Sequence, residues 1–142
     1  MNQTASPTKA LILLLAALTA LTPLAIDAYL PAIPQMASDL ATSIHDTEIS
    51  LSLYLAGFAI GQIFGGPFSD HFGRRAATGS GLSIFCVGTL GIIFSQDIHS
   101  VWLFRVIQAI GGGVAVVNAA AVIRDLSHGK DSARHLSNMA VI

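Results

Sequence analysis

The chain has 142 residues, of which 53% are hydrophobic and only 11% are charged. An ordinary soluble domain carries about 25% charged residues, so this composition excludes a typical water-soluble fold. The net charge of -1 argues against nucleic-acid binding, which needs a clustered basic face. The single cysteine, Cys86, excludes a disulfide framework, and we expect it to be a small buried hydrophobic residue.

Four apolar stretches are long enough to cross a bilayer, whose hydrocarbon core needs about 20 helical residues. Strands are disfavoured because the stretches lack alternation and are rich in Ala, Leu and Gly. The sequence therefore predicts an all-α membrane protein, with residues 1–9 as the N-terminal segment and residues 10–142 as a partial transmembrane bundle. The predicted helices cover residues 10–30, 49–68, 76–94 and 101–123, and a fifth begins near residue 136.

The positions of the cations predict the orientation of these helices. Six of the seven Lys and Arg residues fall before the first helix, between the second and third, or after the fourth. The two loops on the other side contain neither residue type. By the positive-inside rule, the N-terminus is expected in the cytoplasm, which makes the protein a multi-pass integral membrane protein. The six cations are Lys9, Arg74, Arg75, Arg124, Lys130 and Arg134.

The turn between the second and third predicted helices is unusually polar, and reads GPFSDHFGRR from Gly66 to Arg75. Pro67 is expected to end or kink the second helix, and Asp70 to lie near the start of the third. Gly73 permits a tight backbone. These residues predict a short, rigid and charged hairpin.

This turn resembles the loop between helices two and three of the major facilitator superfamily. Phe68 stands where the family pattern has leucine, and His71 where it has arginine. The resemblance implies a gating role, in which a charge network holds the two halves of a transporter together in the outward-facing state. The same analogy adds Arg124 and Asp125 to this network. The residues that match the pattern are Gly66, Asp70, Gly73, Arg74 and Arg75.

Two further stretches carry the same resemblance. LTPLAIDAYLPAIPQMA, residues 21–37, is similar to the first-helix motif of the Bcr/CflA drug-resistance subfamily, and LFRVIQAIGGG, residues 103–113, is similar to the fourth-helix motif of the superfamily. The resemblance runs from about residue 14 to residue 139. It implies a proton-coupled exporter of drugs or small metabolites in the bacterial inner membrane, with lipid, substrate and protons as partners.

The resemblance also implies that the chain is not an enzyme and that a proton gradient, with no cofactor, supplies the energy. A transporter of this superfamily has twelve helices in two similar halves. We therefore expect the chain to be an N-terminal fragment, inactive without the missing C-terminal helices. Two alternatives stay open: a small four-helix exporter, and a membrane scaffold that transports nothing, each acting as an oligomer.

Two ionisable residues, Asp27 and Arg105, are expected inside the membrane at similar depth. An ionised group in hydrocarbon costs at least about 2.5 to 3.5 kcal/mol. We hypothesise that both face one cavity and influence each other's ionisation, with Asp27 as the proton site. The alternative is that both lie in the interface, where Arg105 reaches lipid phosphate and Asp27 is hydrated.

Several polar and aromatic residues are candidates for a substrate cavity. Gln108 follows Arg105 by three residues and shares its helix face, where it contacts either a substrate or a neighbouring helix. For the aromatic residues, packing or an interfacial belt is the alternative. The candidates are Tyr29, Tyr54, Phe58, Gln62 and Gln108.

Glycines recur at helix spacing in the second predicted helix and form a triplet in the fourth, a pattern that lets helices approach closely. The resemblance implies that the second helix slides on the opposite half of the transporter. The five histidines fall in predicted loops without metal-ligand spacing, so no metal site is expected. The packing glycines are Gly57, Gly61, Gly65, Gly111, Gly112 and Gly113.

Overall fold

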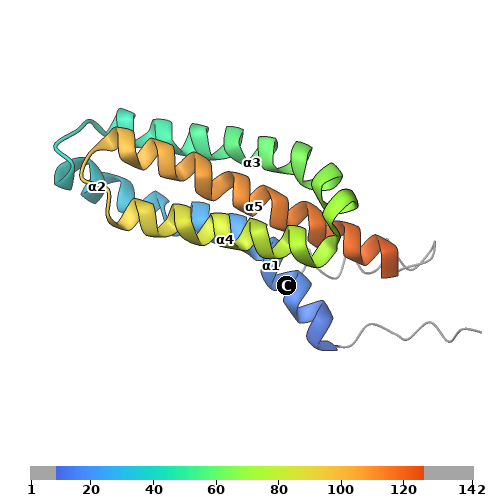
Figure 1. The fold of residues 1–142 in the computed structure, drawn as a ribbon. Coiled ribbons are helices and arrows are strands. Elements are labelled where there is room, and N and C mark those ends of the chain that lie inside the picture. The colour runs from blue at the N-terminus through green and yellow to red at the C-terminus, as the bar shows by residue number, and fades with distance from the viewer. Residues whose placement is uncertain (1–8, 127–142) are drawn as a thin grey trace, which may run out of the picture.

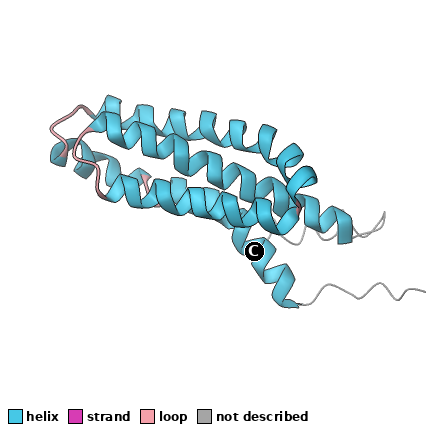
Figure 2. Cartoon of the chain, in the orientation of Figure 1, coloured by secondary structure: helices cyan, strands magenta, loops and turns pink. Residues whose placement is uncertain are grey.

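The computed structural model describes residues 9–126, which form helices and no strand, so the predicted all-α fold is confirmed (Figure 2). Two short helices, the 3-10 helix η1 (Leu30–Ala32) and α2 (Ile33–Asp39), connect the first long helix to the second. The predicted fifth helix lies outside the described residues. The long helices are α1 (Lys9–Asp27), α3 (Ile44–Phe72), α4 (Arg74–Ile93) and α5 (Ile98–Leu126).

Helix α5 is the centre of the bundle. Helices α3 and α4 pack along it, while α1 packs on it less extensively and diverges from the bundle at its N-terminal end (Figure 1). All four long helices have the length and apolar composition of membrane spans. In an apolar stretch of 18 residues within each helix, 61% is buried in α5, against at most 28% in the other three helices. The helices around α5 therefore expose most of their surface, as helices in contact with lipid do.

The ends of the helices differ from the predicted bounds. Helix α1 ends at Asp27, three residues before the predicted end, and Pro31 is the second residue of the 3-10 helix that follows. Proline has no amide hydrogen to donate and its ring clashes with the carbonyl group four residues earlier, which for Pro31 is that of Asp27, so the α-helix stops there while the apolar run continues. Helix α3 begins five residues early, because the Ser43 hydroxyl accepts a hydrogen bond from the Asp46 amide at 3.0 Å and caps the helix.

The charged turn after α3 is shorter than predicted. Helix α3 continues through Pro67 to Phe72, and bends over its last turns (Figure 1). Of the two outcomes expected at Pro67, an end or a kink of the helix, the end is wrong. Asp70 belongs to the last turns of α3, and its carboxylate lies 3.0 Å from Arg74, the first residue of α4. Gly73 alone links the two helices with φ of 89°. This left-handed conformation favours glycine, so the tight backbone predicted at Gly73 is confirmed.

The glycine stripe of α3 lies against α5. A methyl group on Gly57 would lie 2.8 Å from the carbonyl oxygen of Val106, and one on Gly61 would overlap the carbonyl group of Ile110. Gly65 meets α5 in the same way. The three glycines therefore lie at the contact between α3 and α5. The expected sliding contact with the opposite half of a transporter is wrong for this face, because α5 of the same bundle covers it.

Two glycines of the α5 triplet allow close contact with two different helices, α4 and α3. A methyl group on Gly111 would overlap the backbone of α4 at Phe85, and one on Gly113 would overlap the backbone of α3 at Phe58. Gly112 differs, because its nearest neighbours leave room for a methyl group. Close packing therefore explains Gly111 and Gly113 but not Gly112.

Cys86 is exposed on α4, so the expectation that it is buried is wrong. Its neighbours Val87 and Leu90 are also exposed. The physical reason is that the outside of a membrane bundle is apolar, so an apolar residue in a span need not face the protein interior.

Helix α5 begins with a capping interaction from Asp97. The Oδ1 atom of Asp97 accepts the Ser100 amide hydrogen at 2.9 Å, and its Oδ2 atom accepts the Ser100 hydroxyl at 2.7 Å. These hydrogen bonds, above all the one from the Ser100 hydroxyl, hold the pKa of Asp97 below its ordinary value of 3.8. The ionised carboxylate is therefore the form that the folded chain favours.

We predict that a methyl group on Gly61 separates α3 from α5. Gly61→Ala should lower the free energy of unfolding by about 1 to 3 kcal/mol, the usual cost of overpacking. Denaturant titration of the 142-residue chain in detergent measures this change. Gly79→Ala is the control, since a methyl group there meets nothing within 4 Å. Equal stability of the two variants would contradict the packing described.

A second prediction concerns the cap of α5. The pKa of Asp97 measured by NMR titration should lie below 3.8, and Ser100→Ala should raise it. Because the pKa is lower in the folded state, the contribution of the cap to stability is present above the ordinary pKa. It is lost as the pH falls through the lowered value. A Ser100→Ala chain with an unchanged Asp97 pKa would contradict this account.

Candidate functional site

Arg105 lies in the interior of the bundle, and only 2% of it is exposed. Its guanidinium carbon lies 3.7 Å from the centroid of the Tyr29 ring and 4.7 Å from that of the Tyr54 ring. Aromatic rings attract cations through the negative charge on their faces, and more strongly away from water. The interface alternative for Arg105 is therefore wrong, because the side chain is enclosed by protein.

Two hydrogen bonds orient the guanidinium. Its Nη1 atom donates to the Gln108 side-chain oxygen at 2.9 Å and to the Ala25 carbonyl at 3.4 Å. The predicted sharing of one helix face by Arg105 and Gln108 is thus observed as direct contact. The Gln108 Nε2 atom in turn donates to the Thr89 hydroxyl of α4 at 2.9 Å. The network therefore joins α1, α5 and α4.

A hydrogen bond with Ser50 on α3 positions the Tyr29 side chain. Its hydroxyl lies 2.5 Å from the Ser50 hydroxyl, and the Ser50 hydroxyl lies 2.5 Å from the Thr47 carbonyl oxygen, to which it donates. Tyr29 follows the end of α1, so this contact fixes the C-terminal end of α1 against α3. The ring that covers Arg105 is thereby set in position by a second helix.

The structure does not bring Asp27 into contact with Arg105. Asp27 is exposed at the C-terminus of α1, two residues beyond Ala25, whose carbonyl group meets the guanidinium. Across residues 9–126, no carboxylate forms an ion pair with Arg105. In this arrangement, neutral groups surround the positive charge. The proposed role of Asp27 as a proton site stays a hypothesis.

The other candidate cavity residues separate into two groups. Tyr29, Tyr54 and Gln108 gather around Arg105 and are buried. Phe58 is half-buried and Gln62 is exposed, one and two turns further along α3. These two do not belong to the buried cluster.

Sequence reasoning missed two members of this cluster. Ala25 contributes only its backbone carbonyl, so no side-chain signal marks it. Thr89 lies in an apolar run, where a lone hydroxyl residue often bonds to its own helix, and here its hydroxyl also donates to the Phe85 carbonyl at 2.8 Å. The signal that could have identified Thr89 is a polar residue on a neighbouring helix at the same depth in the bundle as Gln108.

A second polar cluster lies at the other end of the bundle, around Arg74. Its Nη1 atom lies 3.0 Å from Asp70 and donates to the Ser69 hydroxyl at 2.8 Å. Its Nε atom lies 3.1 Å from a carboxylate oxygen of Asp125. Arg74 therefore ties the end of α3 to the end of α5. Sequence reasoning missed Ser69. Within residues 9–126, Gly66 and Arg75 take part in none of the hydrogen bonds and ion pairs that Arg74 makes.

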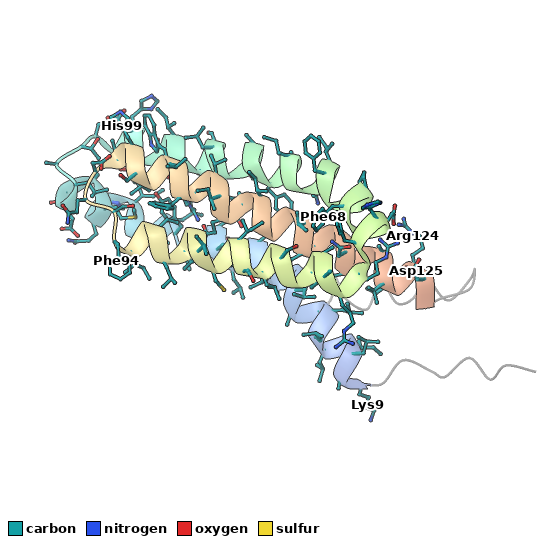
Figure 3. The ribbon with its side chains drawn as sticks, in the orientation of Figure 1. Lys9, Phe68, Phe94, His99, Arg124 and Asp125 are labelled. Carbon is teal, nitrogen blue, oxygen red and sulfur yellow. The ribbon has the colours of Figure 1, made fainter. Side chains whose placement is uncertain are left out.

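The ends of the bundle differ in charge. Lys9, Arg124 and Asp125 lie at one end, whereas Phe94 and His99 lie at the other (Figure 3). Arg74 and Arg75 belong to the first end through the pairing of Arg74 with Asp125. The cations that the sequence placed on one side of the membrane are therefore at one end of the folded chain within the described residues.

Comparisons with known proteins give one family. The model of the Major Facilitator Superfamily matches residues 15–142. The chain is 34% identical over 141 residues to the uncharacterized MFS-type transporter YdgK of Bacillus subtilis, which covers 99% of this chain and 35% of that protein. It is 34% identical over 145 residues to a bicyclomycin resistance protein homolog of Haemophilus influenzae, with 100% and 35% covered.

A third similar protein is the chloramphenicol resistance protein of Pseudomonas aeruginosa, 32% identical over 122 residues that cover 86% of this chain and 29% of that protein. No solved structure matches the chain. The chain spans about a third of the length of the curated relatives it matches. The family match covers most of the chain and agrees with the four apolar helices and the drug-resistance relatives. The chain belongs to the major facilitator superfamily and is consistent with part of a Bcr/CflA-type drug transporter.

Proposed function

We propose that this chain is the N-terminal part of a proton-coupled exporter of drugs or small metabolites. The observation that carries the proposal is the buried Arg105, a permanent cation kept in the interior of a bundle of membrane-spanning length. Such a residue is costly in a membrane, and charged residues of this kind mark transport pathways. Relatives named for resistance to chloramphenicol and bicyclomycin support a drug-like substrate.

The proposed coupling uses Asp27 as the group that takes up and releases a proton. Asp27 is exposed at the C-terminus of α1. It lies two residues from the Ala25 carbonyl group that Arg105 contacts. A deprotonated Asp27 attracts the guanidinium, and a protonated Asp27 does not. The charge of Asp27 therefore biases how closely the outer end of α1 approaches α5.

Helix α1 is the element suited to this movement. It packs on α5 less extensively than α3 and α4 do, and it diverges from the bundle at its N-terminal end (Figure 1). Few contacts are lost when such a helix shifts. We propose that α1 moves relative to α5 between the states of the transport cycle, while α3, α4 and α5 move as one unit.

We further propose that the end of the bundle with Lys9, Arg74 and Arg124 faces the cytoplasm, as the positive-inside rule requires. The N-terminus is then cytoplasmic, and Asp27 lies toward the outer surface. The cluster of Arg74, Asp70 and Asp125 is in this view a cytoplasmic latch, whose ion pairs form in one state of the transporter and break in another.

The proposal predicts that Asp27→Asn uncouples export from the proton gradient. The complete transporter that contains this chain is reconstituted in proteoliposomes, where a pH jump across the membrane should drive drug efflux. Asp27→Asn should abolish the dependence of efflux on the pH gradient, because an asparagine side chain cannot take up and release a proton. Asp39→Asn is the matched control, since Asp39 is exposed on the neighbouring helix α2. Its coupling should equal that of the parent protein.

Unchanged pH-driven efflux in Asp27→Asn would remove Asp27 from the mechanism. The 142-residue chain alone, assayed in the same vesicles, should transport nothing, because rocking of one half against the other needs both halves. Efflux by the chain alone would contradict the proposal that further helices are required.

A further inference from the structure

The amide group of Gln108 connects two different members of the buried cluster. Its oxygen accepts a hydrogen bond from Arg105 Nη1 at 2.9 Å, and its Nε2 atom donates to the Thr89 hydroxyl at 2.9 Å. A side-chain amide carries an acceptor on one side and donors on the other, whereas a guanidinium only donates. A reversed amide would therefore set donor against donor at Arg105. The orientation of this amide decides whether Gln108 compensates the buried cation or opposes it.

The Thr89 hydroxyl selects the favourable orientation. It donates to the Phe85 carbonyl of its own helix at 2.8 Å, and a hydroxyl has one hydrogen to donate. Toward Gln108 the Thr89 oxygen is therefore an acceptor. An acceptor at this place pairs with the NH2 group of the amide and leaves the amide oxygen facing Arg105. A hydrogen bond within α4 thus sets the direction of the next two bonds in the network.

The residue before Thr89 brings α4 close enough for this contact. A methyl group on Gly88 would lie 2.6 Å from the Cα atom of Gln108, and it would also overlap the Gln108 backbone nitrogen. Backbone atoms cannot turn aside as the end of a flexible side chain can, so an added methyl group forces the two helices apart. A side chain at position 88 therefore moves the Thr89 hydroxyl away from the Gln108 amide.

We propose that Thr89, brought into reach by Gly88, is a positioning residue that fixes the Gln108 amide with its oxygen toward Arg105. Thr89 acts through Gln108, because the hydrogen bonds of Arg105 within residues 9–126 go to Gln108 and Ala25. A hydroxyl on α4 thereby controls how well the cation on α5 is compensated. The consequence of this control for transport rests on the proposed function, whereas the orientation of the amide does not.

The orientation is tested in the 142-residue chain in lipid nanodiscs, by the NMR signals of the Gln108 side-chain amide. Gln108→Leu assigns these signals. We expect a proton shifted downfield by its hydrogen bond in the parent chain. Thr89→Val has the same shape but no acceptor and should lose this shift, whereas Thr89→Ser keeps the hydroxyl and should retain it. Gly88→Ala should lose it too, and Thr89→Val decides the question if Gly88→Ala does not fold.

Ser83→Ala is the matched control, because the Ser83 hydroxyl also donates to a carbonyl of α4 but is exposed. It should leave the Gln108 signals unchanged. Two results would overturn the proposal: a Gln108 amide without a downfield proton in the parent chain, or a downfield shift that persists in a folded Thr89→Val chain.

A second experiment separates positioning from a general loosening of the contact between α4 and α5. The pH profile of drug efflux, normalised to its maximum, is measured for the complete transporter in proteoliposomes. A methyl group on Gly81 would lie 2.9 Å from the Gly111 carbonyl oxygen, so Gly81→Ala overpacks the same two helices about two turns from Gly88. We expect Thr89→Val to change the profile, and Thr89→Ser and Gly81→Ala to keep that of the parent protein.

The same change of profile in Gly81→Ala would overturn the positioning role and make Thr89 a structural contact only. Arg105→Met shows whether the proposed function itself holds. Unchanged pH-driven efflux in Arg105→Met would contradict the part of Arg105 in transport, while the amide signals would still decide the orientation of Gln108.

Discussion

A guanidinium enclosed in an apolar bundle must find its compensation inside the protein, and Arg105 imposes this constraint on the four long helices. Its charge lies against two tyrosine rings, one following α1 and one on α3. Its hydrogen bonds reach the Ala25 carbonyl and Gln108, which continues to Thr89 on α4. Four helices therefore contribute to one buried charge. Loss of any of these groups leaves the cation less well compensated, so the cluster restricts how α1, α3 and α4 can be arranged around α5.

The glycines make this arrangement possible. Van der Waals packing, and not the exclusion of water, drives the association of helices in lipid, so close approach of backbones is the main source of stability. Gly57 and Gly61 bring α3 onto α5, and Gly111 brings α4 onto it. The resulting closeness allows side chains as short as Thr89 to reach the polar network of α5. Gly112 is the exception, since it leaves a space where packing alone would accept a methyl group.

Hydrophobicity was enough to predict the number of long helices and the all-α fold within the described range. The helix ends were less predictable, because they depend on single local contacts such as the cap from Ser43 and the position of Pro31. The contact between Arg105 and Gln108 followed from their spacing of three residues. Helix spacing says which residues share a face, but it does not say which helix that face meets.

That limit explains where the predictions failed. The glycine stripe of α3 was identified from its spacing of four residues, yet its partner is α5 and not the other half of a transporter. The equal depth of Asp27 and Arg105 did not bring them together, because Asp27 lies at the end of α1 on an exposed face. The Ala25 carbonyl that replaces it belongs to the backbone, which every residue type supplies. Depth along a helix is readable from sequence, whereas rotation about its axis is set by tertiary packing.

The most direct test of this account is a double-mutant cycle between Arg105 and Tyr29. Arg105→Met and Tyr29→Leu, alone and together, are compared by the free energy of unfolding of the chain in detergent. Tyr29→Leu removes the hydrogen bond between Tyr29 and Ser50 whether or not Arg105 is also replaced, so this loss cancels in the coupling energy. Compensation of the buried charge by the ring predicts a favourable coupling of about 1 to 2 kcal/mol. A coupling of zero would contradict it, and would mean that the guanidinium is compensated by groups other than the tyrosine.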